Sequence, residues 1–305
     1  MSPPPWLWIV ITVGAGFAQT LRNAAQKHLT GELGALGATL VRFLYGLPFA
    51  ALWFSALHLV GNDSIPHANE SFGAWVMLGA TSQIIATALL LRVMKEKSFA
   101  IGVAYSKTEV LQVAVFGLMF LRDPLTFSVV LAVVLGTFGV LLFSPADRAR
   151  PLQTLFHGWT SRSAALGIAS GTFFALSAVG FRGAALSLEG SSFLMTAGFT
   201  LLTAQMIQTL MLGGWLAWRD PQVIGRCIRA WRTSLLAGGM GATASAGWFT
   251  AMAIEPVAHV RTLGLIELFF GAIVSRRIFR EPLTKTEIAG MCLLVLSVAI
   301  ITLAK

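Results

Sequence analysis

"FLRDPLT" at Phe120–Thr126 returns later in the chain as "IFREPLT" at Ile278–Thr284, and this repetition decides how the sequence is organised. Each copy lies between two apolar runs, near the end of its half of the chain. The same separation in sequence, applied to the residues that precede the two segments, aligns Glu109 with Glu267. Similar segments at a fixed spacing are the sequence signature of an internal repeat.

A second pair of similar segments lies near the start of each half. "RNAAQ" begins at Arg22 and "RGAAL" begins at Arg182, with nearly the same spacing as the first pair. The small difference in spacing is what a difference in loop length would produce. The sequence therefore predicts two repeats, residues 1–145 and 164–305, joined by a connection at residues 146–163.

The composition is that of a membrane protein. Of the 305 residues, 56% are hydrophobic and only 11% are charged, and the mean hydropathy is +0.76. A soluble domain carries roughly twice this charged fraction. The apolar runs are also too long for the strands or helices of a soluble core. We therefore predict a polytopic helical membrane protein that contacts the lipid bilayer.

Windows of about 20 residues, the length that crosses a bilayer as a helix, divide the chain into ten spans. Their predicted limits are 6–27, 34–57, 72–92, 98–121, 125–143, 164–186, 192–218, 233–254, 257–279 and 283–304. Five spans per repeat is an odd number, so the two halves lie in opposite orientations. The predicted fold is an all-α integral membrane protein with ten transmembrane helices, arranged as two inverted five-helix repeats around a central cavity.

Several classes of function have no support in the sequence. The net charge of +9 is explained by basic residues between the apolar runs, and no basic cluster with interleaved aromatic residues predicts a nucleic-acid surface. Cys227 and Cys292 predict neither a disulfide framework nor a metal site. There is no phosphate-binding loop, zinc-binding HExxH pair or GxSxG nucleophile motif. We predict no enzyme, catalytic residue, metal or cofactor; an intramembrane enzyme and a non-transporting scaffold stay as remote alternatives.

The repeat resembles the drug/metabolite transporter superfamily, specifically proteins with two EamA-type five-helix repeats. The "RDPLT" and "REPLT" junctions carry the resemblance, together with the ten spans. One departure is that Val110 and Leu268 stand where many members have proline after the acid. The resemblance implies a transporter in a bacterial-type inner (plasma) membrane that exports amino acids or other metabolites.

The orientation of the chain has two conflicting indications. Most Lys and Arg residues lie in the connections after the odd-numbered spans, and the rule that basic loops stay inside puts both termini outside the cytoplasm. The resemblance implies cytoplasmic termini instead. The charge distribution belongs to this chain, so we expect the connection at Arg226–Arg232 to be cytoplasmic. A membrane-impermeant thiol reagent would then fail to reach Cys227 in intact cells.

Glu109 and Glu267 lie near the middle of the fourth and ninth predicted spans. Ionisable residues at this depth are expensive and commonly functional, so both are candidates for binding a proton or a solute. The alternative is a structural role in pairing helices. Regular helix periodicity places Tyr105, Glu109 and Gln112 on one face and Lys107 on another, where it would need a partner from a neighbouring helix.

Other polar residues inside the spans form a second group of candidates. Arg42 either extends to the interface or neutralises one of the acids, and Arg261 is expected to extend to the interface. The neutral groups either line the cavity or form hydrogen bonds between helices, worth about 1 kcal/mol each. These neutral candidates are Gln19, Asn23, Gln83, Ser245 and Trp248.

Together these features predict a secondary transporter that moves a small organic solute by alternating access. Proton exchange at one or both carboxylates is the suggested coupling. Glu267 is slightly favoured, because the other charge in its span, Arg261, lies near the end of the span, whereas Glu109 shares its depth with Lys107. Uptake of a quaternary ammonium or similar cation is the alternative, suggested by the two acids and the available aromatic residues. Substrate, direction, coupling ion and oligomeric state stay open.

Overall fold

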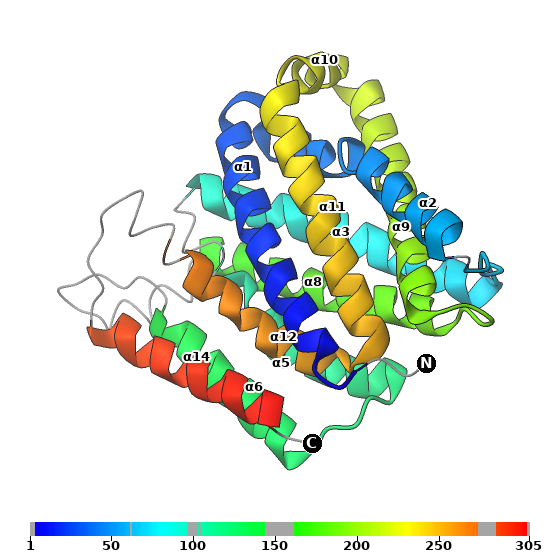
Figure 1. The fold of residues 1–305 in the computed structure, drawn as a ribbon. Helices are drawn as coiled ribbons and strands as arrows, with labels where there is room; N and C mark the ends of the chain where they lie inside the picture. Colours follow the sequence, from blue (N-terminus) through cyan, green and yellow to red (C-terminus); the bar gives the residue numbers. More distant parts are fainter. Residues whose placement is uncertain are drawn as a thin grey trace.

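The computed structural model describes residues 4–61, 63–96, 103, 105–143, 162–271, 273 and 285–303, and the protein is all-α over these residues (Figure 1). The first half contains α1 (Leu7–Leu44), α2 (Leu47–Gly61), α3 (Glu70–Glu96), α5 (Glu109–Phe116), the π-helix η1 (Gly117–Leu121) and α6 (Phe127–Phe143). The second half contains α8 (Arg162–Leu186), α9 (Phe193–Arg219), α10 (Pro221–Arg229), α11 (Trp231–Ile254), α12 (Val257–Leu263), the 3-10 helix η2 (Gly264–Ile266) and α14 (Lys285–Leu303).

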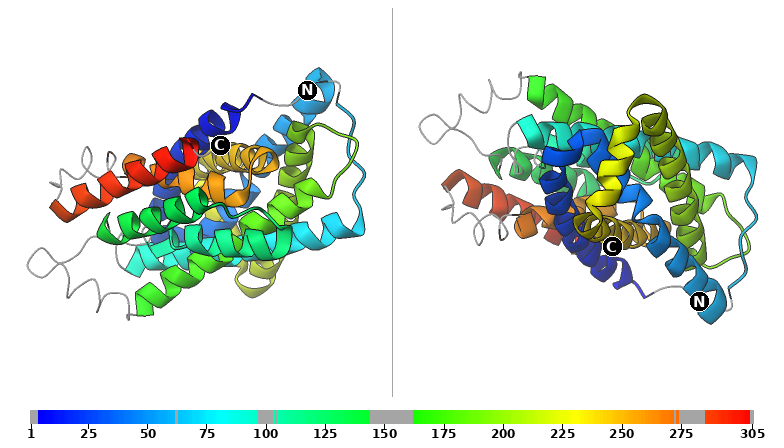
Figure 2. Two further views of the ribbon diagram at one scale, coloured as in Figure 1. Left: turned by 90° about the horizontal axis from the view of Figure 1, so that it is seen from below. Right: turned by 90° about the horizontal axis from the view of Figure 1, so that it is seen from above.

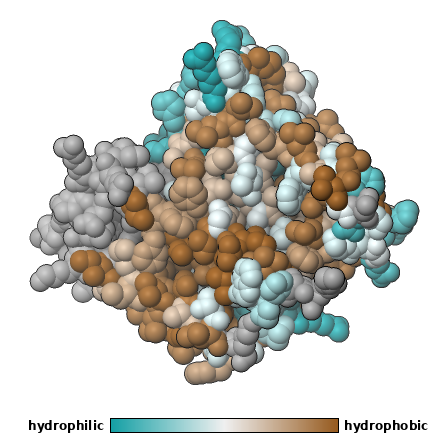
Figure 3. Space-filling view, viewed as in Figure 1, coloured by the Kyte–Doolittle hydropathy of each residue, from teal (hydrophilic) through white to brown (hydrophobic). Residues whose placement is uncertain are grey.

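Within the described residues, four helical segments are long and apolar enough to cross a membrane: Leu7–Gly61, Glu70–Glu96, Arg162–Leu186 and Phe193–Arg219. Shorter apolar helices occupy Glu109–Leu121, Phe127–Val140 and Ile288–Leu303. Apolar residues cover much of the visible surface, whereas hydrophilic residues gather at its top, over α10 (Figure 3).

The first two predicted spans are confirmed as helical, but the connection expected between them is helical too. The chain stays helical from Leu7 to Leu44, with one break at Gly34, where φ is 70° and ψ is 175°. This left-handed φ is favourable only for glycine. A second break precedes α2 at Gly46. A side chain does not fit there, because its Cβ atom would lie 2.5 Å from the carbonyl oxygen of Arg42.

Helices of one half pack mainly against helices of the other half. In Figures 1 and 2, α1 lies beside α11, and α6 lies beside α14. The other main pairs are α3 with α8 and α2 with α9, and α5 also packs against α12. Small residues allow close approach: a Cβ atom on Gly247 of α11 would lie 2.8 Å from the Cβ of Ala15 in α1. A Cβ on Gly180 of α8 would lie 2.7 Å from the amide nitrogen of Gly79 in α3.

The fourth predicted span is not a regular helix around its acid. α5 begins at Glu109, and a turn at Lys107 and Thr108 separates it from the helical residues 103, 105 and 106. The amide of Thr108 donates to the carbonyl of Tyr105 at 3.3 Å, and that of Val110 donates to Lys107 at 3.2 Å, which is the tighter 3-10 spacing. Gly171 of α8 permits this turn, because a Cβ there would lie 2.9 Å from the carbonyl oxygen of Ser106.

The ninth predicted span also changes its helix type next to its acid. α12 ends at Leu263, and the 3-10 turn of η2 leads directly to Glu267. Each half therefore places its repeat-related acid beside a short irregular segment rather than inside a uniform α-helix. Such breaks leave backbone groups and side chains pointing in directions that helix periodicity does not predict.

The first junction, Phe120–Thr126, ties the halves together through Asp123 and Arg182. The Arg182 guanidinium lies 3.2 Å from the Asp123 carboxylate and also donates to the carbonyls of Met252 and Glu255. The other carboxylate oxygen of Asp123 accepts the amide of Val257 at 3.3 Å, at the first residue of α12. This carboxylate therefore stabilises the start of the helix that leads to Glu267. The second junction, Ile278–Thr284, and most of the 146–163 connection lie outside the described residues.

α10, in the connection expected to be cytoplasmic, buries Cys227. The Cys227 thiol is fully buried and lies 3.8 Å from the carbonyl oxygen of Gly37. Burial raises the pKa of Cys227 to about 11, so the reactive thiolate is scarce near neutral pH. The expectation that labelling of this cysteine would report the orientation was therefore wrong, because a buried neutral thiol reacts poorly from either side.

We predict that Gln222→Cys, an exposed position on α10, reports the orientation instead. In a Cys292→Ser background, an impermeant maleimide should leave the introduced thiol unlabelled in intact cells and label it after permeabilisation. The parent Cys292→Ser protein is the control, and its buried Cys227 should label weakly in both conditions. Strong labelling of the Gln222→Cys protein in intact cells would contradict a cytoplasmic α10 and place the termini in the cytoplasm.

Candidate functional site

A small cavity lies where α1, α3, α5, α8 and α12 meet Glu267, the residue after η2, and it has room for about one water molecule. Its charged lining comes from both halves of the chain. These charged residues are Arg22, Lys107, Glu109, Arg261 and Glu267. The two repeat-related acids therefore line one cavity, and each is at most 3% exposed.

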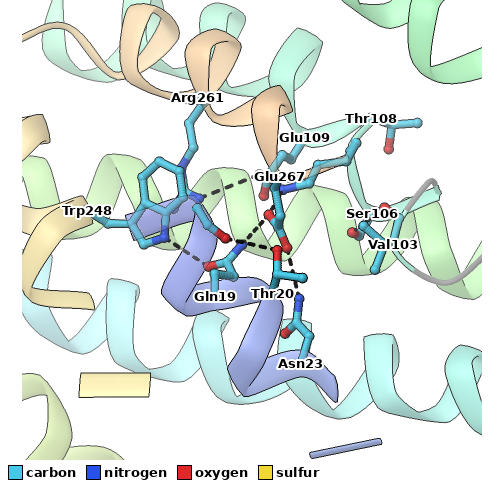
Figure 4. Close-up of polar contacts among 12 residues, drawn as sticks. Gln19, Thr20, Asn23, Val103, Ser106, Thr108, Glu109, Trp248, Arg261 and Glu267 are labelled. Atoms are coloured by element: carbon cyan, nitrogen blue, oxygen red, sulfur yellow. Dashed lines mark hydrogen bonds and ion pairs between the residues drawn. The ribbon is translucent and has the colours of Figure 1, made fainter. Parts of the chain in front are cut away.

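Glu267 is held by three donors (Figure 4). Its Oε2 atom accepts from Lys107 Nζ at 2.5 Å and from Gln19 Nε2 at 2.7 Å. Its Oε1 atom accepts from Asn23 Nδ2 at 3.0 Å. Three donors, one of them cationic, satisfy this buried carboxylate well. Gln19 and Asn23, two of the neutral candidates from the sequence, both reach the acid from α1.

Glu109 is held less tightly than Glu267. Its Oε1 atom lies 3.8 Å from Lys107 Nζ and 3.6 Å from the Arg261 guanidinium. Both contacts are ion pairs longer than a hydrogen bond, and no hydrogen bond to this carboxylate occurs among the described residues. Glu109 thus has electrostatic stabilisation without strong directional bonds.

Lys107 does not turn away from Glu109 as the helix periodicity predicts. The turn before α5 brings its ammonium group between the two carboxylates, so it bridges Glu109 and Glu267. The prediction was wrong because it assumed a continuous helix through residues that form a turn. The partner that Lys107 needs from another helix is Glu267, so this cation belongs to the site.

Arg261 also lies in the site, and the expectation that it extends to the interface was wrong. It is 6% exposed, and its guanidinium lies 4.8 Å from the centre of the Trp248 ring as well as beside Glu109. Trp248 in turn donates its indole N–H to Gln19 Oε1 at 2.9 Å. The ring packs closely on η2, since a Cβ on Gly264 would lie 2.7 Å from it. Trp248, Gln19 and Glu267 form a continuous hydrogen-bonded row (Figure 4).

Arg42 is buried, but neither of its two predicted roles is observed. It is 2% exposed and donates to Thr87 Oγ1 at 2.9 Å and to Ser245 Oγ at 3.4 Å. No carboxylate among the described side chains pairs with it. Ser245 therefore binds Arg42 and does not line the cavity. Gln83 does not line the cavity either: it accepts a hydrogen bond from Gln208 at 2.9 Å, which joins α3 to α9.

Tyr105 and Gln112 do not share the position of Glu109. Tyr105 packs with Val93 and Ala164 in a separate apolar cluster, against Gly167 of α8. Gln112 is not part of the cavity lining, although its side-chain oxygen is buried and accepts no hydrogen bond from the described residues. The break before Glu109 rotates Tyr105 away, which corrects the prediction of a common polar face.

Four residues of the lining were not predicted from the sequence: Arg22, Leu90, Ser106 and Phe174. Arg22 is the most important because it carries a charge and is 1% exposed. Its Nε and one terminal nitrogen donate to Asn23 Oδ1, at 3.2 and 2.7 Å. The repeated "RNAAQ" segment was a signal that could have identified it, because it begins with this arginine.

Comparisons with known proteins show the fold but not the function. No family model matches the chain, and neither does any curated protein. The chain is similar to a solved structure described only as "Crystal structure of protein", with a TM-score of 0.66 and 15% sequence identity. The similarity covers 97% of this chain and 96% of that one, so the two share a fold along their whole length.

We predict that Glu267→Gln destabilises the protein more than Glu109→Gln does. Replacing Glu267 leaves the Lys107 ammonium without its closest partner, and breaking a buried ion pair costs about 3–5 kcal/mol. Glu109 has only the longer contacts, so its replacement should cost less. Apparent melting temperatures of the purified variants in one detergent test the order. A Glu109→Gln protein that melts at or below the temperature of Glu267→Gln would contradict it.

Proposed function

We propose that the protein is a secondary transporter that moves a small organic solute by alternating access. The observation that carries the proposal is the buried cluster of five charges at the junction of the two halves. Burying this many charges inside an apolar helical protein is costly, and such residues commonly mark a solute or proton pathway. A cavity between two repeats is also where transporters with repeated halves bind their solutes.

The packing of the helices supports ten spans in two inverted repeats. Under the alignment of Glu109 with Glu267, α1 corresponds to α8 and α3 corresponds to α11. The pair α1–α11 in the structure therefore corresponds to the pair α8–α3, and both are observed. The pairs α2–α9 and α6–α14 each join equivalent helices, and the contact of α5 with α12 joins the fourth predicted span to its equivalent, the ninth. This is the pattern expected of two halves related by a two-fold axis, and it agrees with the resemblance to the drug/metabolite transporter superfamily.

Exposed apolar side chains support a membrane location. Phe127 on α6 is 81% exposed and Leu210 on α9 is 71% exposed, and both belong to apolar helices. Large apolar surfaces of this kind are stable in lipid but not in water. A bacterial-type inner membrane is the proposed location, with the basic α10 connection on the cytoplasmic side.

The charges of the site are neutralised largely from within. Lys107 bridges the two acids and Arg261 approaches Glu109, so each acid has a cationic partner from the protein itself. A solute that enters must displace some of these contacts, because the cavity has room for about one water molecule. Most of these contacts cross between the halves, so exchanging them for solute contacts loosens one half from the other. This provides a physical link between solute binding and alternating access.

Glu109 is the better candidate for proton exchange. Its carboxylate has two longer ion-pair contacts, whereas Glu267 accepts three hydrogen bonds, one from a cation. Any change at Glu267 would disturb three hydrogen bonds at once, two of them from α1. This reverses our sequence-based preference for Glu267, which rested on the absence of a nearby cation that Lys107 in fact supplies.

Counterflow in proteoliposomes tests transport directly. Liposomes loaded with one unlabelled solute should accumulate the same labelled solute from outside, for at least one member of a panel of amino acids, organic acids, nucleobases and quaternary amines. An intramembrane enzyme or a scaffold predicts no such exchange. Protein-free liposomes are the control, and absence of counterflow across the whole panel would contradict the proposal.

We predict that Glu109→Gln folds and still exchanges solute but loses the dependence of transport on pH. Gln keeps the volume and hydrogen-bonding capacity of Glu but cannot exchange a proton. Glu96→Gln is the matched control, because Glu96 pairs with Arg92 on α3 and is not part of the cavity lining. A Glu109→Gln protein with the same pH profile as the Glu96→Gln control would assign proton exchange elsewhere.

A further inference from the structure

Basic residues gather in the short connection between α9 and α11. Residues 218–232 contain four arginines and one acid, Asp220, so this segment carries a net charge of +3. Asp220 lies 3.6 Å from the Arg226 guanidinium. The other three arginines are exposed, and none of them forms an ion pair with a carboxylate of the described residues. These are Arg219, Arg229 and Arg232, and hydrophilic residues gather at this end of the molecule, over α10 (Figure 3).

Large apolar side chains lie exposed among these arginines. Trp218 in the last turn of α9 is 79% exposed, Trp231 at the start of α11 is 52% exposed, and Ile228 on α10 is 59% exposed. The Arg232 guanidinium lies 5.5 Å from the centre of the Trp231 ring, so a cation and an aromatic ring occur side by side. A loop surrounded by water gains nothing from exposing three such side chains, whereas tryptophan is enriched where a protein passes from acyl chains to headgroups.

α10 has the features of a helix that lies in a membrane surface. It crosses between the ends of α9 and α11 (Figure 1). Val223 and Cys227, one turn apart, are buried against the protein, and Ile228 continues this apolar face but stays exposed. Arg229 follows Cys227 by two residues, which places it on the opposite side of the helix. The apolar face is therefore wider than the protein covers and a basic side chain lies opposite it, which is the pattern of interfacial helices.

We propose that the surface formed by residues 218–232 binds the headgroups of anionic phospholipids. A planar guanidinium matches the oxygens of a phosphodiester, and three unpaired arginines favour a lipid with a net negative charge over a zwitterionic lipid. Trp218, Ile228 and Trp231 then contact the adjoining acyl chains. This apolar contact distinguishes a phospholipid from free phosphate, which carries negative charge without acyl chains. The proposal requires a membrane location but does not require that the protein transports a solute.

A lipid bound at this surface also stabilises α1. A Cβ atom on Gly37 of α1 would lie 2.9 Å from Val223 Cγ1, so α10 fits closely against α1 just after the break at Gly34. The Tyr45 hydroxyl, directly after α1, donates to the Cys227 carbonyl at 3.2 Å. α10 thus holds the last part of α1 near both of its ends, and a lipid that fixes α10 in place raises the stability of the folded protein.

Melting with matched lipids tests the proposal on the unmodified protein. The purified full chain is heated in dodecyl maltoside micelles that contain phosphatidylglycerol or the same mole fraction of phosphatidylcholine. We expect phosphatidylglycerol to raise the apparent melting temperature by a few degrees more than phosphatidylcholine does, and we expect high salt to reduce this difference. Inorganic phosphate without lipid should leave the melting temperature unchanged. Equal shifts with the two lipids, or the full shift with inorganic phosphate alone, would overturn the proposal.

Variants of the exposed side chains locate the lipid site. A triple variant with Arg219→Gln, Arg229→Gln and Arg232→Gln should lose most of the difference between the two lipids, because the unpaired cations are gone. Trp218→Ala keeps every charge and should also reduce the difference, because contact with the acyl chains is lost. An unchanged difference in the triple variant would overturn the proposal, and an unchanged difference in Trp218→Ala would overturn the acyl-chain contact.

The matched control is a second triple variant, with Arg92→Gln, Lys95→Gln and Arg162→Gln. It removes the same charge from exposed positions on α3 and α8, which the predicted spans place on the same side of the membrane as α10, and it should keep the difference between the lipids. Equal losses in the two triple variants would overturn a site at α10, since net charge alone would then explain the effect. Melting does not involve transport, so a failure of counterflow leaves this proposal intact, and a failure of lipid binding leaves the transport proposal intact.

Discussion

The ion pair between Lys107 and Glu267 is the interaction on which the rest of the site depends. The ammonium comes from the first half of the chain and the carboxylate from the second, and their atoms lie 2.5 Å apart. Taking either charge out of water alone costs several kcal/mol, and the attraction repays this only with good geometry and further hydrogen bonds. Gln19 and Asn23 supply those hydrogen bonds to Glu267, so the pair is stable only when α1, α5 and η2 meet correctly.

Much of the surrounding structure serves to bring these two charges together. The turn before α5 directs Lys107 inward, and Gly171 of α8 leaves the space that this turn requires. Asp123 stabilises the first turn of α12, which leads through η2 to Glu267, and is itself held by Arg182 from α8. Both supports cross between the halves. The contacts that position the two charges are therefore also contacts between the halves.

The sequence predicted the helical class, most of the long helices and the burial of the two acids, because these follow from hydropathy and spacing. It could not predict the surroundings of the acids. Helix periodicity assigned Lys107 to the wrong face because the chain leaves the helix at that residue. Arg261 was expected to extend to the interface, but a long side chain reaches either solvent or a buried acid, and only tertiary packing decides which. Arg22 was noticed only as part of a repeat, since nothing local shows that its guanidinium enters a cavity.

The interaction energy between Lys107 and Glu267 tests the central claim most directly. A double-mutant cycle of Lys107→Gln, Glu267→Gln and the double variant measures it from reversible unfolding in mixed micelles. If this pair joins the halves, each single variant loses stability because one buried charge stays without its partner. The double variant should then be more stable than the sum of the two losses predicts, by more than about 1 kcal/mol. Losses that simply add would contradict the account, because the two charges would then be independent of each other.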